Sequence, residues 1–262
     1  MKVIAIANQK GGTGKTATAI NMAGALNQLG RKVLVVDLDA QANASSWLTG
    51  TSFPDGQVVY DVLLRKSKIH DCIINTPENI DLLPANLSLA SLDLDLLSVL
   101  SREYRLAREL EVLHNKYSYC LIDCPPNLSM TTLNGLMAAH YVIAPVECKT
   151  EAFQALPRLA NTIGSVVTER RGLLPFYALP TFMERTNLAR DIHQQLQNTF
   201  EAGCLPAINK STRIAEAFTN HQTIFSYDPT STGALDYMRT TKEFLYAIRE
   251  ARQEIQEAES IG

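Results

Sequence analysis

The stretch Lys-Gly-Gly-Thr-Gly-Lys-Thr at residues 10–16 carries the clearest chemistry in this sequence. Glycines allow the backbone to approach a ligand closely and to point several N–H groups at it. The lysine and hydroxyl residue that end the stretch, Lys15 and Thr16, are of the types that reach phosphate oxygens and a magnesium ion. The stretch therefore predicts a phosphate-binding loop.

The segments on either side of this loop are those that a phosphate site requires. Residues 3–7 form a short apolar run that predicts a buried parallel strand, and Ala17 to Leu29 follow a helical pattern that stops at Gly30. The helix adds the positive end of its dipole to the loop, whereas the alternative is a glycine-rich turn that happens to contain a lysine. The expected nucleotide-binding residues are Lys10, Gly11, Gly12, Thr13, Gly14, Lys15, Thr16 and Ala17.

Carboxylates follow two further predicted strands. Asp37 and Asp39 come after the apolar run at residues 32–36, and Asp123 ends the apolar run at residues 119–122, before two prolines. Parallel strands place their carboxyl ends at the ligand-binding edge of an α/β sheet, so these residues should lie beside the loop. Asp123 fits a magnesium-binding role, since Mg²⁺ prefers oxygen ligands. The alternative for Asp37 and Asp39 is a helix N-cap and a solvated turn carboxylate.

The loop resembles the deviant Walker A signature, Lys-Gly-Gly-x-Gly-Lys-Thr, of the ParA/Soj/MinD ATPases, although Gln9 stands where most phosphate loops have glycine. The resemblance implies a single-domain α/β P-loop NTPase over residues 1–262, with a mostly parallel twisted sheet flanked by helices on both faces. It also implies ATP and Mg²⁺ as cofactors and a homodimer that closes over two nucleotides. Lys15 would bind its own nucleotide, and Lys10 would reach the nucleotide of the partner subunit. The alternative for Lys10 is a solvated loop lysine.

The resemblance assigns further roles around the nucleotide. Asp39 matches the aspartate that positions the attacking water, and it joins Thr16 and Asp123 as a candidate magnesium ligand. Ala40 stands where the family's Asp-x-Asp-Pro-Gln segment has proline, which should loosen this turn. Thr181 and Met183 are expected near the adenine base.

A second resemblance lies in the last third of the chain. Residues 208–218 are similar to a segment of many ParA proteins in which an arginine contributes to ATP-dependent, sequence-independent DNA binding. The expected DNA-binding residues are Arg213, Lys210, Arg185 and Arg190, and the alternative is that they are ordinary surface residues. Phosphate contacts of this kind make binding strongly dependent on salt. Lys149 could also reach phosphate, but a solvated loop lysine is the simpler interpretation.

The composition is that of an ordinary globular protein. The 262 residues are 46% hydrophobic and 19% charged, and the net charge of −3 requires any DNA binding to come from a local patch. The five cysteines lack Cys-x-x-Cys spacing, so Cys120 and Cys124 are expected to be core thiols rather than ligands of an iron–sulfur cluster. We expect a cytoplasmic, nucleoid-associated protein without a membrane anchor, since no apolar run could span a bilayer and the closing helix is acidic.

The leading hypothesis is an ATPase that positions a cargo, such as a plasmid, a chromosome or a protein body like the carboxysome. A ParB-like or adaptor protein would stimulate its slow hydrolysis of ATP. One alternative is a MinD-like, membrane-associated regulator of cell division, and another is an iron–sulfur or metabolic relative.

Other elements are predicted from hydrophobic periodicity. The expected helices lie at residues 59–64, 87–100, 102–115, 152–171 and 237–258. The expected strands lie at residues 72–74, 80–83, 140–146 and 176–179.

Overall fold

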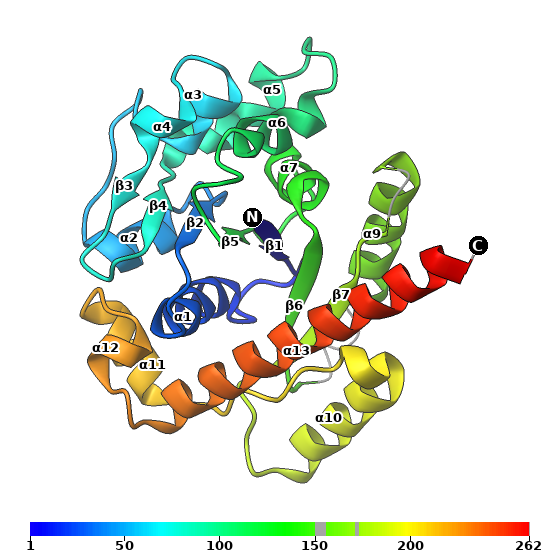
Figure 1. Ribbon diagram of the computed structural model, residues 1–262. Coiled ribbons are helices and arrows are strands. Elements are labelled where there is room, and N and C mark those ends of the chain that lie inside the picture. The colour runs from blue at the N-terminus through cyan, green and yellow to red at the C-terminus, as the bar shows by residue number, and fades with distance from the viewer. Residues whose placement is uncertain (150–155, 171–172, 262) are drawn as a thin grey trace.

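The computed structural model describes residues 1–149, 156–170 and 173–261, and their side chains except those of Arg170 and residues 250–261. The described residues form a seven-stranded sheet in the order β3-β4-β2-β5-β1-β6-β7, with helices on both faces (Figure 1). Only β3 runs antiparallel to its neighbour among these strands. The predicted fold class is therefore confirmed. The strands are β1 (Lys2–Ile6), β2 (Val33–Asp37), β3 (Ile74–Asn75), β4 (Asp81–Leu83), β5 (Tyr119–Asp123), β6 (Tyr141–Glu147) and β7 (Phe176–Thr181).

Helices connect the parallel strands. The α-helices are α1 (Lys15–Gln28), α2 (Asn43–Thr49), α3 (Val59–Leu63), α4 (Ile69–Cys72), α5 (Leu92–Asp95), α6 (Arg105–Glu111), α7 (Met130–Ala138), α9 (Leu156–Arg170), α10 (Asn187–Phe200), α11 (Thr212–Thr219), α12 (Ile224–Tyr227) and α13 (Thr232–Ile261). Three short 3₁₀ helices are η1 (Leu87–Ser91), η2 (Arg102–Tyr104) and η3 (Glu201–Gly203). None of the helices among the described residues is both long and apolar enough to cross a membrane.

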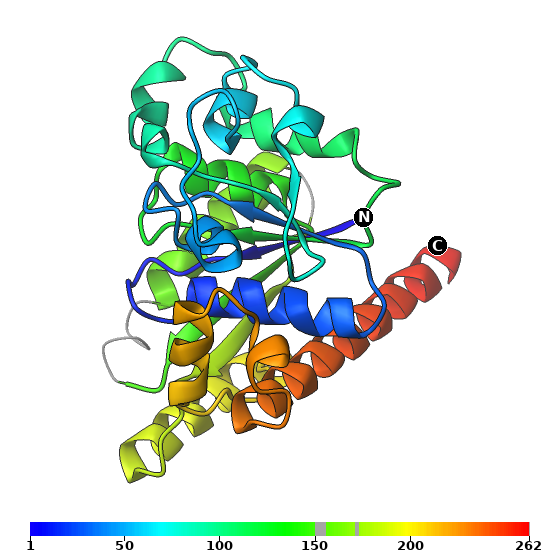
Figure 2. The same cartoon turned by 90° about the vertical axis from the view of Figure 1, so that its left-hand side faces the viewer.

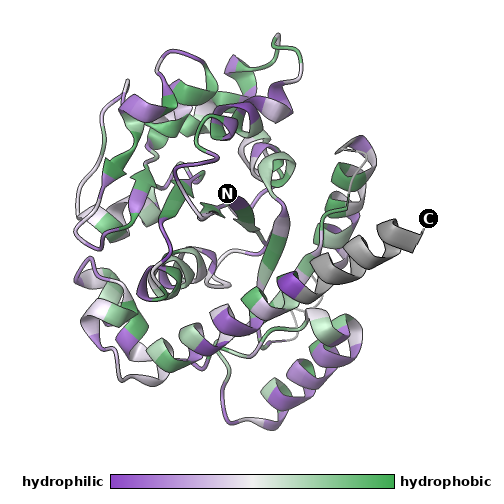
Figure 3. Ribbon diagram, viewed as in Figure 1, coloured by the Kyte–Doolittle hydropathy of each residue, from purple (hydrophilic) through white to green (hydrophobic). Residues whose placement is uncertain are grey.

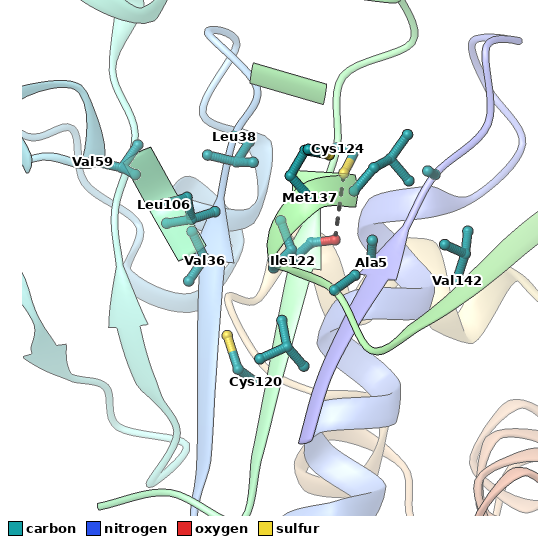
Figure 4. Close-up of a cluster of buried hydrophobic side chains, with 14 of the residues drawn as sticks. Ala5, Val36, Leu38, Val59, Leu106, Cys120, Ile122, Cys124, Met137 and Val142 are labelled. Atoms are coloured by element: carbon teal, nitrogen blue, oxygen red, sulfur yellow. Dashed lines mark hydrogen bonds between the residues drawn. The ribbon is translucent and has the colours of Figure 1, made fainter. Parts of the chain in front are cut away.

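The strands are apolar on both sides, so each face of the sheet has its own core (Figure 3). Alternate residues of β1 enter different cores: Val3 and Ala5 pack beneath α3–α7, α9 and α10, while Ile4 and Ile6 pack against α1, α2 and α11–α13. Figure 4 shows the first core, where Ala5, Ile122 and Met137 lie close together. Two buried faces of this kind hold the strand ends in fixed positions.

The register of the central strands brings the predicted carboxylates to one edge. Asp37 at the end of β2 and Ile6 at the end of β1 are both aligned with Asp123 at the end of β5. Helix α1 starts at this edge and runs back along the sheet (Figure 2). The loop that precedes α1 is therefore placed directly beside the carboxylates.

The prediction of one helix over residues 87–100 is wrong. The structure has η1, the short helix α5 and then turns, with Leu97 and Leu100 exposed. Asn86 accepts a hydrogen bond from the backbone of Ser88, and the Ser91 hydroxyl donates to the Ser88 carbonyl. Such local side-chain bonds to the backbone compete with a continuous helix.

Several other boundaries differ from the prediction. Residue Cys72 ends helix α4 instead of starting a strand, because a short apolar run does not distinguish a helix from a strand. The predicted helix at residues 102–115 is broken into η2 and α6 and ends at Glu111. Residues 152–155 and 171 of another predicted helix lie outside the described residues, as do the side chains of Ala251 and Ile255 in the closing helix.

The closing helix α13 starts at Thr232 and packs across α1. The predicted core residues Phe244 and Ile248 are buried on this helix, and the ring of Phe244 makes edge contacts with Tyr141 and Tyr177. This packing fixes α13 against one face of the sheet, next to the segments that follow β7.

Candidate active site

The loop between β1 and α1 has the backbone that its glycines predict. Gly12 and Gly14 have φ angles of 73° and 87°, in the left-handed region that side chains other than glycine rarely adopt. A Cβ atom built on Gly11 or Gly12 would meet no atom within 4 Å, so the space over this part of the loop is open. The loop is attached to the end of β7, because the hydroxyl of Thr181 donates a hydrogen bond of 2.9 Å to the carbonyl of Thr13.

Lys15 is buried within the loop, with 7% of its surface exposed. Its ammonium group donates a hydrogen bond of 3.0 Å to the carbonyl of Lys10. Burial lowers the pKa of Lys15, and the nearby Asp123 is the strongest of the groups that oppose this shift. A cation held this close to loop carbonyls and carboxylates is suited to bind a phosphate oxygen.

The three strand-end aspartates have different surroundings. Asp37 is fully buried, and one of its oxygens accepts bonds of 2.8 Å from both the backbone and the hydroxyl of Ser45 in α2. Burial raises the pKa of Asp37 to about 6, although the bonds from Ser45 oppose the shift. Asp37 therefore holds the first turn of α2 from outside the helix, whereas the N-cap position itself is taken by Ala42.

Asp39 is half-buried and organises the turn after β2. Its side chain accepts a bond of 2.9 Å from the backbone of Gln41, and its carbonyl accepts one from Ala42. These bonds order the turn, although Ala40 stands where the resembled Asp-x-Asp-Pro-Gln segment has proline. Because Asp39 is only half-buried, its carboxylate remains accessible to water.

Asp123 is 1% exposed, and neither of its carboxylate oxygens has a hydrogen-bond partner of good geometry. Burial and then Asp37 raise its pKa well above the usual range, while the Thr16 hydroxyl and the Lys15 ammonium lower it. A buried carboxylate without a partner is costly, and a cation would remove that cost. This donor set of carboxylate and hydroxyl oxygens fits a magnesium ion.

Lys10 lies at the surface of the loop, with 28% of its side chain exposed. Its ammonium group is 3.8 Å from a carboxylate oxygen of Glu147, at the end of β6. The other oxygen of Glu147 pairs with Lys149 at 2.6 Å. Lys149 is thus paired beside the loop, whereas Lys10 stands at the rim of the site, where a second molecule could reach it.

An apolar pocket of about 250 Å³ opens directly beside the phosphate loop. Its walls come from the loop, from the segments after β7 and before α11, and from α2, α11 and α13. They are formed by Gly14, Ala17, Trp47, Thr181, Phe182, Ile208, Asn209, Ser211, Ile214, Ala215, Phe218 and Tyr237. A flat aromatic base attached to a phosphate chain would fit such a pocket.

The two residues predicted near the base have different positions. Thr181 lines the pocket, but its hydroxyl is already bonded to the phosphate loop. Met183 is half-buried beside the pocket, and its backbone N–H donates to the carbonyl of Ile208 at 3.0 Å. No sequence pattern indicated the other walls, such as Trp47 and Phe218, because these residues come together only in the folded chain.

The four residues predicted to bind DNA do not form one cluster of unpaired charge. Arg213 bonds to Glu216 at 2.8 Å and lies 3.4 Å from Asp228, while Lys210 bonds to Glu184 at 2.6 Å. Arg185 and Arg190 are exposed, in the loop after β7 and on α10. All four lie on the segments that follow β7, but acidic neighbours reduce the positive charge of two of them.

The cysteines are free thiols, and four of the five are buried. Burial raises the pKa of both Cys120 and Cys124 far above the usual range. Among the described residues, no three histidine, cysteine or acidic side chains are grouped closely enough to hold a metal ion by themselves.

Comparison with known proteins agrees with this geometry. Residues 1–174 match the family model described as an AAA domain. The chain is 38% identical to the sporulation initiation inhibitor protein Soj of Bacillus subtilis, over 92% of this chain and 97% of that protein. It is 32% identical to the chromosome partitioning protein ParA of Caulobacter vibrioides, over 94% of each chain.

Solved structures show the same similarity. Cobyrinic acid a,c-diamide synthase from Mycobacterium smegmatis, with a bound ATP analogue and magnesium, is 34% identical, with a TM-score of 0.80 over 96% of this chain and 97% of that one. A plasmid partition protein from Borrelia burgdorferi is 26% identical, with a TM-score of 0.74 over 94% and 99% of the two chains. The chain therefore belongs to the Soj and ParA family of P-loop ATPases.

Proposed function

We propose that the chain is an ATP-dependent positioning ATPase that forms an ATP-bound homodimer and binds DNA without sequence preference. The observation that carries this proposal is Lys10, a second lysine at the exposed rim of a phosphate loop whose first lysine, Lys15, is buried in place. A site that is completed by a second subunit would use a lysine in this position, because its ammonium group would reach the nucleotide of the partner.

ATP would bind with its phosphates in the open space over Gly11 and Gly12 and its base in the adjoining pocket. The loop N–H groups and Lys15 would bind the phosphate oxygens. Thr16 and Asp123 would hold magnesium, with Asp39 as a further candidate, and the metal would neutralise charge on the β- and γ-phosphates. The named relative with a bound ATP analogue and magnesium supports this assignment.

Asp39 would orient the attacking water and accept its proton. Two observations support this role. Asp39 is near enough to Lys15 and Asp123 to affect their pKa values. One of its carboxylate oxygens also accepts a bond from the backbone of Gln41. Asp37 cannot take this role in the same way, because its carboxylate is buried against Ser45. Hydrolysis by this arrangement alone would be slow, and a ParB-like or adaptor protein would accelerate it.

The positioning role follows the names of the partition relatives from Caulobacter and Borrelia. Binding to DNA would place the protein on the nucleoid, in the cytoplasm. The synthase reaction in the name of the mycobacterial relative belongs to that protein, and nothing in the described residues of this chain favours it over positioning.

DNA binding would depend on Arg213, with contributions from Lys210, Arg185 and Arg190. Arg213 is a fixed cation, because Glu216 and Asp228 hold its guanidinium at the surface of α11. The side chain is 54% exposed and can still contact a phosphate. The carboxylates would weaken this contact, so we infer that the bound state needs several such cations acting together.

The Arg213→Ala variant is expected to bind a random-sequence DNA duplex about tenfold more weakly in the presence of ATP, because it loses one phosphate contact. The slope of log affinity against log salt concentration should decrease in magnitude by about one, which corresponds to the loss of one phosphate contact. Fluorescence anisotropy of a labelled duplex would measure both. The control is Arg31→Ala, an exposed arginine just before β2, at the opposite edge of the sheet from the site. Equal binding by the Arg213 and Arg31 variants would show that α11 does not contact DNA.

A further inference from the structure

Asn209 lies on the wall of the base pocket, on the segment that precedes α11. This segment runs beside the one that follows β7, since Met183 and Asn209 form a parallel bridge and the Lys210 N–H donates to the Met183 carbonyl at 3.1 Å. The pocket also includes Gly14 and Ala17 of the phosphate loop and the start of α1. Asn209 is therefore an exposed polar side chain that lines a largely apolar pocket, and this pocket adjoins the phosphate loop.

The amide group of Asn209 is held by a buried carboxylate. Its side-chain nitrogen donates to one oxygen of Asp236 at 2.8 Å, and its backbone N–H donates to the same oxygen at 2.9 Å. Asp236 is 5% exposed, and its other oxygen accepts a bond of 3.1 Å from Arg239. Arg239 also donates to the carbonyl of Ala207, which ties the whole segment to α13. Both oxygens of Asp236 thus accept hydrogen bonds from neighbouring donors.

This arrangement fixes which end of the amide is available. A carboxylate accepts hydrogen bonds only, so the NH₂ group of Asn209 must face Asp236. The amide oxygen is the remaining polar atom of the side chain, and it is an acceptor. Without Asp236, the amide could rotate and present either group.

We propose that Asn209, oriented by Asp236, selects adenine over other purine bases through its amide oxygen. The exocyclic amine of adenine is a donor and can bond to this acceptor. Hypoxanthine and guanine carry a carbonyl oxygen at the same ring position, which would face the amide oxygen acceptor to acceptor. This inference rests on the proposed function, because it requires ATP to bind at the phosphate loop. Asn209 would act on the base directly, whereas Asp236 is a positioning residue.

The test is a comparison of ATP and ITP, which differ at this ring position. Trp47 is the only tryptophan in the chain and lies on the pocket wall, so its fluorescence reports base binding without hydrolysis. Titrations with each nucleotide and magnesium should show that the wild-type protein binds ATP about tenfold more tightly than ITP. A difference of this size corresponds to the one hydrogen bond that adenine makes to Asn209 and hypoxanthine cannot make. Asn209→Ala should bind ITP at least as tightly as the wild type does, because the opposed acceptor is gone, and should lose most of the preference for ATP.

A second variant separates base reading from structural support. Asp236→Asn leaves Asn209 in place but allows its amide to rotate, so it should also reduce the preference for ATP over ITP. If these residues had a purely structural role, each variant would bind ATP and ITP more weakly by the same factor, and the ratio of the two affinities would not change. This result in either variant would overturn the proposal. If the wild-type protein binds neither nucleotide, the proposed ATP site itself fails. If it binds both equally, ATP binding stands and the selective role of Asn209 is wrong.

Discussion

Replacing Asp39 with asparagine is expected to lower the rate of ATP hydrolysis by roughly 100-fold to 10,000-fold while ATP binding is retained. Asparagine has the same shape, and its amide oxygen can still accept the bond from the backbone of Gln41 that orders this turn. The amide cannot accept a proton from water. The loss would therefore report the chemistry of the carboxylate and not a change in the local fold.

Phosphate release measured at saturating ATP would give the hydrolysis rate, and titration of Trp47 fluorescence would give the ATP affinity of the same preparation. Asp39→Ala should be equally inactive, and it also removes the bond to Gln41, so the two variants together separate chemistry from turn structure. Both should accumulate as ATP-bound dimers, because the dimer cannot proceed to ADP. Wild-type turnover in the asparagine variant would show that another group positions the water.

Replacing Lys10 with alanine is expected to abolish ATP-dependent dimerisation. An ammonium group that pairs with the partner's phosphates in a closed interface contributes about 2–5 kcal/mol, so its loss should move the monomer–dimer equilibrium far toward the monomer. ATP binding to the monomer should change little, because Lys15 remains buried in its place under the loop. Light scattering after size exclusion, with ATP in the buffer, would measure the mass directly.

Lys149→Ala is the matched control for this variant. Lys149 and Lys10 both lie beside Glu147, at 2.6 Å and 3.8 Å from its carboxylate oxygens, so either change removes one positive charge from the same place. Loss of the dimer in the Lys10 variant alone would assign the effect to the loop lysine. A stable ATP dimer of Lys10→Ala with normal hydrolysis would contradict the trans role of Lys10.

The parts of the fold that local patterns determine were predictable from the sequence. Continuous apolar runs that end in aspartate, such as those before Asp37 and Asp123, predicted strands buried on both faces and carboxylates at one edge. The glycines of the loop predicted a turn that can bind phosphate, and Gly12 and Gly14 have the left-handed backbone that favours glycine. These signals are strong because few other residue types tolerate those positions.

The parts that depend on distant contacts were not predictable. The base pocket joins Trp47 to Phe218, whose rings make an edge contact, and no pattern in the sequence links these positions. The same holds for the bond between Asn209 and Asp236, and for Glu184 and Glu216, which pair with the predicted DNA-binding cations. Charge counts along the chain do not show which charges are neutralised by a neighbour in space.

The family resemblance assigned different roles to the two aspartates after β2, and the structure adds a physical reason for the difference. Asp37 and Asp39 are two residues apart and are equivalent by spacing alone. Burial and the bonds from Ser45 assign Asp37 to holding α2, which leaves Asp39 as the carboxylate available for water. The structure also shows how the turn is ordered without a proline at position 40, since Asp39 accepts the hydrogen bonds that order it.

The measurement that tests the central claim most directly is binding of the wild-type protein to a random-sequence DNA duplex with ATP, with ADP and without nucleotide, across a series of salt concentrations. We predict binding with ATP only, with log affinity falling linearly as log salt rises, because several cations of the dimer would contact phosphates. Binding that is absent in all three states, or the same in all three, would contradict a nucleotide-controlled DNA-bound ATPase.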